Sequence, residues 1–324
     1  MSELDSKPMM RPIALKNVNC AYCGRDFSDE LPSTREHVIG RRFVPKGSLA
    51  VQWNLILNAC RYCNNKKSHL EGDISVITML PTHVEREAAT ETVLSKEIAR
   101  KAAKAISERT KKPVSKSQEA IQLEFERGAA KISTEFFAPP QIDHSRVYKL
   151  AQFHFTAFFF LITYNESTRR GGFVLGDYMH FGFFRRENWG AVDALWFLQL
   201  TESWEHRCAG DGADGFFRIH IRKCPGANVW SFAVEWNQSH RVLAFAGDPQ
   251  EIQRLLESVP NAVSTWVRLR DGNLVRLTES ISLDPSIDTL FAQIEAAPAS
   301  ADWRVGDAAD LPETNKPSLG GLFH

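Results

Sequence analysis

Apolar and polar residues follow a helical spacing in the first half of this 324-residue chain. Residues 85–110 are rich in Glu, Ala, Lys and Arg, and apolar residues recur there every three or four positions, which predicts a helix. Residues 118–133 predict a second helix. Residues 145–163 are apolar at most positions, so we expect a buried helix whose phenylalanines lie in the core.

The second half changes to the pattern of strands. Three stretches rich in β-branched and aromatic residues predict strands over 216–222, 229–236 and 241–245. Short turn-forming segments separate them, so we expect an antiparallel meander. An amphipathic helix over 249–259 and a hairpin around Asp271-Gly272 are predicted to follow. The chain is therefore predicted to belong to the α+β class.

Composition suggests four segments in a chain long enough to bury a sizeable core. Pro139-Pro140 is the preferred boundary, because two prolines interrupt regular structure. We expect an N-terminal domain over 1–80, a basic helical connector over 81–138, an α+β domain over 139–296 and a mobile tail over 297–324.

Charge is distributed unevenly, although the 39 basic and 39 acidic residues balance overall. Residues 1–134 hold 22 Lys and Arg against 16 Asp and Glu, so binding to phosphate would fall to this part. Arg100, Lys101 and Lys104 begin a run of cations that could follow a nucleic-acid backbone. A solvated helix end is the alternative explanation of the same run.

No signal peptide or membrane span is expected. Residues 1–19 lack an apolar core, and the longest apolar run, over 151–164, is too short to cross a bilayer. We therefore expect a cytoplasmic protein without a membrane partner. Cys208 and Cys224 are expected to be free thiols in that compartment.

The remaining four cysteines form two Cys-x-x-Cys pairs, separated by 36 residues. Such pairs make tight knuckles that bind zinc, and the intervening length lets the two knuckles meet. Four thiolates leave no open coordination position, so this zinc would be structural. The predicted ligands are Cys20, Cys23, Cys60 and Cys63.

Further polar residues lie in a fixed order around these knuckles. Glu36-His37 and then Asn54 lie between the pairs, and Asn64-x-x-Lys67 follows the second pair. This order resembles the HNH endonuclease family in its zinc-supported form, over residues 18–80. The resemblance implies a ββα-metal fold, in which two antiparallel strands and a helix grip one divalent cation.

The resemblance also implies a role for each motif residue. His37 matches the general base that activates water, while Glu36 and Asn64 match the ligands of the catalytic cation. Asn54 matches the residue that braces the loop and orients the histidine. Carboxylate and amide oxygens suit Mg²⁺ or Mn²⁺, and a neutral imidazole can accept a proton near pH 7.

Two features of this stretch depart from the family pattern: Glu36 stands where Asp is more frequent, and Gly40 where Pro often follows. Lys67 falls where the family usually has a lysine facing phosphate, and Arg41 and Arg42 could touch a DNA backbone. Neighbouring residues of a regular strand point to opposite faces, so Glu36 and His37 could not both point inward from one. A bulge or a strand end is therefore predicted at Glu36-His37.

The sequence thus predicts a metal-dependent endonuclease that acts on DNA, with RNA not excluded. Restriction, phage defence, mobile-element activity and repair all remain open as its context. A zinc-ribbon protein that binds nucleic acid without cutting it is the first alternative. The C-terminal half is expected to provide target selection, regulation of the nuclease or oligomerisation. A second alternative is a regulated effector whose C-terminal half binds a small ligand or a partner and holds the nuclease silent.

Overall fold

The computed structural model describes residues 12–50, 52–80, 93–127, 130–174, 178–260, 264–268, 274–278, 280–291 and 304–305. Within these ranges the chain is a mixed α+β protein with five α-helices and a large antiparallel sheet. This agrees with the predicted class.

The N-terminal part contains a small sheet followed by a helix. Strands β1 (Ile13–Ala14), β2 (Ser33–His37) and β3 (Leu55–Cys60) form this sheet in the order β1-β3-β2. Strand β2 pairs with β3 in antiparallel register, and β1 pairs with β3 in parallel. Helix α1 (Arg61–Met79) begins directly after β3. Strand β2 stops at His37, as predicted, but Glu36 and His37 both pair with β3 in regular register, so no bulge turns their side chains to the same face.

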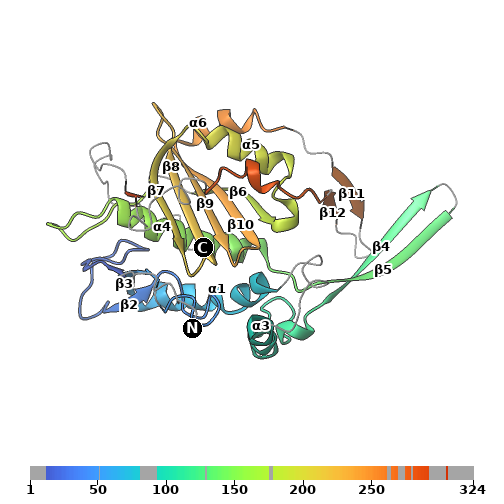
Figure 1. Ribbon diagram of the computed structural model, residues 1–324, viewed down its shortest axis with the longest axis horizontal. Helices are drawn as coiled ribbons and strands as arrows, with labels where there is room; N and C mark the ends of the chain where they lie inside the picture. Colours follow the sequence, from blue (N-terminus) through green and yellow to red (C-terminus); the bar gives the residue numbers. More distant parts are fainter. Residues whose placement is uncertain are drawn as a thin grey trace, which may run out of the picture.

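The connecting region differs from its prediction. Helix α3 (Val93–Lys104) ends six residues before residue 110, where the expected helix was to end; residues 85–92 lie outside the described ranges. The helix expected over 118–133 is wrong. Strands β4 (Glu119–Arg127) and β5 (Ala130–Ala138) pair there in antiparallel register, and Figure 1 shows this hairpin reaching away from the rest of the molecule.

The sequence offers a physical reason for that error. Ile121, Leu123 and Phe125 alternate with polar residues at the two-residue period of a strand. The intervening Gln and Glu residues are good helix formers, and their propensity masks this period. A short 3-10 helix, η1 (Val114–Lys116), precedes the hairpin.

The large sheet follows the order β13-β7-β8-β9-β10-β6. Its strands are β6 (Tyr178–Arg185), β7 (Glu205–Gly212), β8 (Phe217–Lys223), β9 (Val229–Trp236), β10 (His240–Gly247) and β13 (Arg304–Val305). Strands β8, β9 and β10 confirm the predicted antiparallel meander. Strands β6 and β7 were not predicted, and neither was helix α5 (Val192–Thr201).

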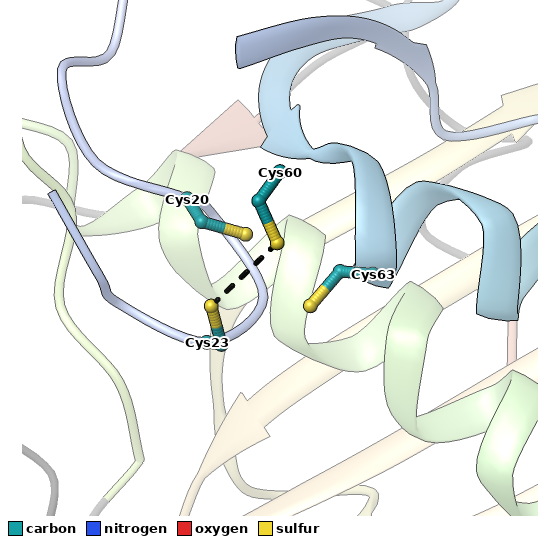
Figure 2. Close-up of side chains that lie close together, drawn as sticks. All are labelled: Cys20, Cys23, Cys60 and Cys63. Carbon is teal, nitrogen blue, oxygen red and sulfur yellow. Dashed lines mark hydrogen bonds between the residues drawn. The ribbon is translucent and has the colours of Figure 1, made fainter. Parts of the chain in front are cut away.

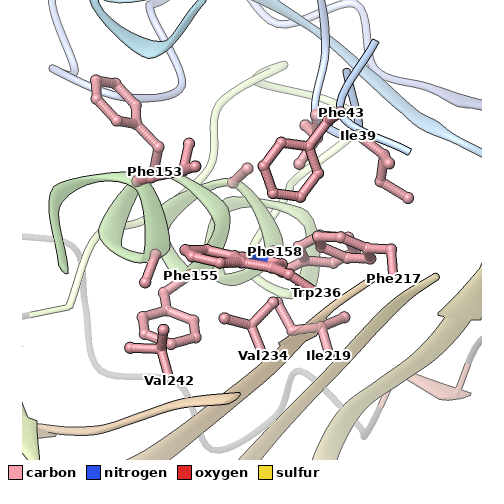
Figure 3. Packing of buried hydrophobic residues seen from close by; sticks show 14 of the residues in the cluster. Ile39, Phe43, Phe153, Phe155, Phe158, Phe217, Ile219, Val234, Trp236 and Val242 are labelled. Atoms are coloured by element: carbon pink, nitrogen blue, oxygen red, sulfur yellow. The ribbon is translucent and has the colours of Figure 1, made fainter. Parts of the chain in front are cut away.

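Helices cover both faces of the large sheet (Figure 1). Helix α4 (His144–Ile162) matches the predicted buried helix and packs on one face, where its phenylalanines join the core (Figure 3). Helices α5 and α6 (Pro249–Leu256) pack on the other face and form a second, smaller core with β9 and β10.

The C-terminal region contains the predicted hairpin. Strands β11 (Ser264–Arg268) and β12 (Leu274–Thr278) pair in antiparallel register, although Asp271-Gly272 itself lies outside the described residues. Two 3-10 helices, η2 (Arg186–Asn188) and η3 (Pro285–Ile287), complete the elements. The tail expected over 297–324 lies outside the described residues except for β13, which pairs with β7.

One hydrophobic core joins the N-terminal part to the large sheet. Phe43, in the loop after β2, meets Trp236 of β9 edge-on, with ring centroids 5.5 Å apart. In the turn between β9 and β10, Asn237 Nδ2 donates to the Phe43 carbonyl oxygen at 3.2 Å and to Thr78 Oγ1 at 2.8 Å. The same core cluster contains residues of β3, α1, α4 and the sheet. Figure 3 shows Phe43 among labelled residues of α4 and the sheet.

Among the described residues, no helix is both long enough and apolar enough to cross a membrane.

Candidate functional site

Four cysteines converge at the junction of the small sheet and α1 (Figure 2). Cys20 and Cys23 lie in the loop before β2, Cys60 ends β3 and Cys63 lies in the first turn of α1. Their sulfur atoms all lie within 4.8 Å of one another. A tetrahedral zinc site with Zn–S bonds of about 2.3 Å separates its sulfurs by roughly 3.8 Å. The four predicted ligands could therefore hold a zinc ion.

The four thiols of this cluster influence one another's ionisation. Hydrogen bonding with Cys23 raises the pKa of Cys20 and hydrogen bonding with Cys20 raises the pKa of Cys63, whereas the pKa of Cys23 is lowered by its hydrogen bond with Cys20. A zinc ion would favour the ionised form of these cysteines, because it binds thiolates. Arg25 Nε lies 3.5 Å from Cys23 Sγ and supplies a further positive charge. Cys208 and Cys224 are free thiols away from the cluster, as expected.

Glu36 and Lys67, both predicted site residues, contact each other. Glu36 Oε1 lies 2.9 Å from Lys67 Nζ and also accepts a 3.2 Å hydrogen bond from the Tyr22 hydroxyl. Lys67 is only 1% exposed, so its ammonium faces protein carboxylates where the prediction had it facing phosphate. Burial opposes its charge, but Glu36 and Glu71 outweigh burial and raise the pKa of Lys67, which therefore stays protonated.

Glu71 is a further member of the site that was not predicted. It lies one turn after Lys67 on α1, and its Oε1 is 2.5 Å from Lys67 Nζ. The i, i+4 spacing of Lys67 and Glu71 is the only signal for this pair in the sequence. Burial raises the pKa of the Glu71 carboxyl.

Glu71 also gives a physical reason for the glycine at position 40. A Cβ atom at position 40 would lie 2.6 Å from Glu71 Oε2. The Gly40 backbone N–H donates to the same carboxylate. Proline would both crowd this carboxylate and remove the donor.

Asn64 faces β2 from the first turns of α1. Its Nδ2 donates to Thr34 Oγ1 at 3.0 Å, and Thr34 in turn donates to the Ala59 carbonyl oxygen at 2.8 Å. Thr34 and Glu36 are two residues apart on β2, so both side chains point toward α1. Alternation directs His37 to the opposite face, because β2 and β3 pair without a register shift.

His37 is partly exposed at the end of β2. Burial, followed by the nearby charges of Arg41 and Arg35, lowers its pKa, so its imidazole is neutral at pH 7. Asn54 holds the chain just beyond it. The Asn54 side chain accepts from the Ile39 N–H at 3.1 Å and donates to the Ile39 carbonyl oxygen at 2.8 Å.

The predicted nucleic-acid contacts divide into two groups. Arg41, Arg42, Arg100 and Lys104 are exposed. Lys101 instead attaches α3 to the loop after β2, because its Nζ donates to the Val44 carbonyl oxygen at 2.9 Å and to that of Arg42 at 3.3 Å. This attachment places α3 beside the loop that carries Arg41 and Arg42.

Comparison of the chain with protein-family models, with curated proteins and with solved structures found no match.

Proposed function

We propose that this chain is a metal-dependent endonuclease of the HNH type that hydrolyses phosphodiester bonds in DNA. One observation carries the proposal: the motif residues gather on a single unit of β2, β3 and α1 that is tied together by the four cysteines. The order of these residues in the sequence gives the unit its resemblance to the family.

His37 is the proposed general base. It needs to be neutral to take a proton from water, and its lowered pKa keeps it so at physiological pH. Asn54 supports this role by fixing both backbone polar groups of Ile39, two residues beyond the histidine.

Glu36 and Asn64 are the proposed ligands of the catalytic Mg²⁺ or Mn²⁺. Both side chains lie between β2 and α1, and the Asn64 amide oxygen is available because Nδ2 makes the contact with Thr34. When bound, the cation would neutralise charge on the phosphate and on the leaving oxygen. Zinc in the four-cysteine cluster would only stabilise the fold.

DNA is the proposed partner. Arg41 and Arg42 on the loop after β2, with Arg100 and Lys104 on the attached helix α3, supply exposed positive charge beside the site. Such charges bind phosphates without reading sequence.

Plasmid cleavage by the purified full-length protein tests this proposal. We expect nicking or linearisation with Mg²⁺ or Mn²⁺, none with EDTA, and none with His37→Ala, which should retain its DNA affinity. Equal cleavage by the wild type and His37→Ala would remove the proposed base.

A second candidate function is nucleic-acid binding without cleavage. Two observations favour it: Glu36 is ion-paired with Lys67, and alternation along β2 directs His37 away from Glu36. This candidate predicts DNA binding by wild type and His37→Ala alike, with no cleavage in any metal.

A further inference from the structure

Lys67, Glu36 and Glu71 form a buried group of three charges between β2 and α1. The Lys67 ammonium lies 2.9 Å from Glu36 Oε1 and 2.5 Å from Glu71 Oε1. The side chains of Lys67 and Glu36 are 2% and 7% exposed. A cation is thus already held at this point, out of contact with water, and that cation belongs to the protein itself.

The atoms around this ammonium are those that a hard divalent cation prefers. The His37 carbonyl oxygen lies 3.5 Å from Lys67 Nζ, so oxygens from three residues on two elements point to one place. The Tyr22 hydroxyl donates to Glu36 Oε1 and fixes that carboxylate. Mg²⁺ is commonly held by one or two carboxylates, with water and substrate phosphate completing its shell.

The balance of charge also favours a dication. One ammonium carries a single positive charge, whereas two carboxylates meet it in this buried place. A divalent cation would match both negative charges. It could not enter while the ammonium stays, because two positive centres within a few ångströms repel each other strongly at low dielectric.

We propose that the catalytic cation displaces Lys67, and that Glu71 then shares this cation with Glu36. This inference rests on the proposed function for the role of Glu36, and it adds Glu71 as a ligand and Lys67 as a regulator. The metal-free protein is then closed, and cation binding requires the lysine side chain to leave its place.

Mn²⁺ binding to the zinc-loaded full-length protein, followed by electron paramagnetic resonance, tests the inference without relying on activity. Lys67→Met should bind Mn²⁺ roughly tenfold or more tightly than the wild type, because it removes the competing charge. Lys66→Met is the matched control, since it removes the same charge from the adjacent residue of α1, whose ammonium lies over the Tyr62 ring. Equal Mn²⁺ affinity in Lys67→Met and Lys66→Met would overturn the proposal.

Glu71 is tested in the same background. Lys67→Met combined with Glu71→Gln should lose the gain in Mn²⁺ affinity, and retention of the gain would remove Glu71 as a ligand. Lys67→Met leaves two carboxylates facing each other and could fail to fold without a divalent cation. Mn²⁺ should then restore the folded protein in circular dichroism, and failure of this rescue also counts against displacement.

The two proposals fail in different ways. Tighter Mn²⁺ binding by Lys67→Met with no plasmid cleavage in any variant would refute the nuclease and keep the displacement. Cleavage that depends on His37, with Mn²⁺ affinity unchanged in Lys67→Met, would keep the nuclease and refute the displacement.

Discussion

The Trp53 indole nitrogen donates a 2.7 Å hydrogen bond to the Asp211 carbonyl oxygen and so joins the entry of β3 to β7 across 158 residues of chain. The same ring meets Phe158 of α4 edge-on, with centroids 6.3 Å apart. Gly212 is required beside it, since a Cβ there would lie 2.9 Å from the indole. The N-terminal unit is therefore held by the large sheet through specific contacts.

Replacing Trp53 measures how far the two parts depend on each other. Trp53→Ala should lower the free energy of unfolding by about 3–5 kcal/mol, because it leaves a cavity in the shared core. Trp53→Phe keeps an aromatic ring and loses the hydrogen bond, so we expect the smaller loss of about 1–2 kcal/mol. Urea denaturation checks both values. Stability of Trp53→Ala equal to that of the wild type would mean that the N-terminal unit folds independently.

Zinc should contribute directly to stability. Cys63→Ser should lose bound zinc and several kcal/mol of stability, a fall in Tm of roughly 10 °C or more. Cys224→Ser is the control, because this thiol lies away from the cluster. Metal analysis and thermal unfolding provide the readouts. Retained zinc with an unchanged Tm in Cys63→Ser would show that the cluster does not bind the metal.

Proline at position 40 should destabilise the protein. Gly40→Pro places atoms against the Glu71 carboxylate and removes a hydrogen-bond donor, so a loss of about 2–3 kcal/mol is expected. Gly72→Ala on the same helix as Glu71 is the comparison. No atom lies within 4 Å of its added Cβ, and alanine stabilises a helix by about 1 kcal/mol over glycine. A stable Gly40→Pro protein would argue against the Glu71 contact.

The pKa of His37 should depend on Arg41. Burial, Arg41 and Arg35 hold this pKa below its usual 6.5, so the proposed base should lose its activity only when the pH falls below that value. Removing a positive charge makes protonation easier, so Arg41→Gln should raise the pKa of His37. NMR titration of the imidazole measures it, with Arg42→Gln as the control. If the pKa of His37 is the same in Arg41→Gln and in the wild type, the charge of Arg41 does not lower it.

Two lysines of α3 should behave differently. Lys101→Met leaves the carbonyl oxygens of Arg42 and Val44 without this donor and should cost about 1–2 kcal/mol of stability. Lys104→Met should leave stability unchanged but weaken DNA binding, and reduce the salt dependence by about 0.9 in the log–log slope. Denaturation and binding at several salt concentrations separate the two effects. If only Lys101→Met weakened DNA binding, then Lys101, and not Lys104, would be the lysine that contacts DNA.

The sequence predicted those helices and strands whose apolar residues repeat at a clear period and whose packing in the fold matches that period. The strands from Phe217 to Phe245 and the phenylalanine-rich helix were predicted because their apolar residues repeat at a clear period. Strand β7 escaped prediction, because Gly210 and Gly212 look like a loop when the packing of Trp53 against Gly212 is unknown.

The candidate site was predicted in its cysteines but only partly in its charges. The Cys-x-x-Cys spacing predicts each pair as a local knuckle, and the fold then brings the two pairs together, with all four sulfurs within 4.8 Å of one another. The spacing of Lys67 after Asn64 does not reveal that its ammonium points into the protein. That depends on how α1 packs on β2, and only this packing brings Glu71 near Gly40.

The contact between Asn237 and Phe43 has a consequence for synthesis of the chain. These residues are 194 positions apart, so the ribosome adds the later one roughly 10–40 s after the earlier one at about 5–20 residues per second. During that time the loop beyond His37 lacks the turn that holds it. The part proposed to cut nucleic acid is thus held by this contact only late, after strands β6 to β9 of the large sheet have been made, and a truncated chain released before Asn237 would lack the contact.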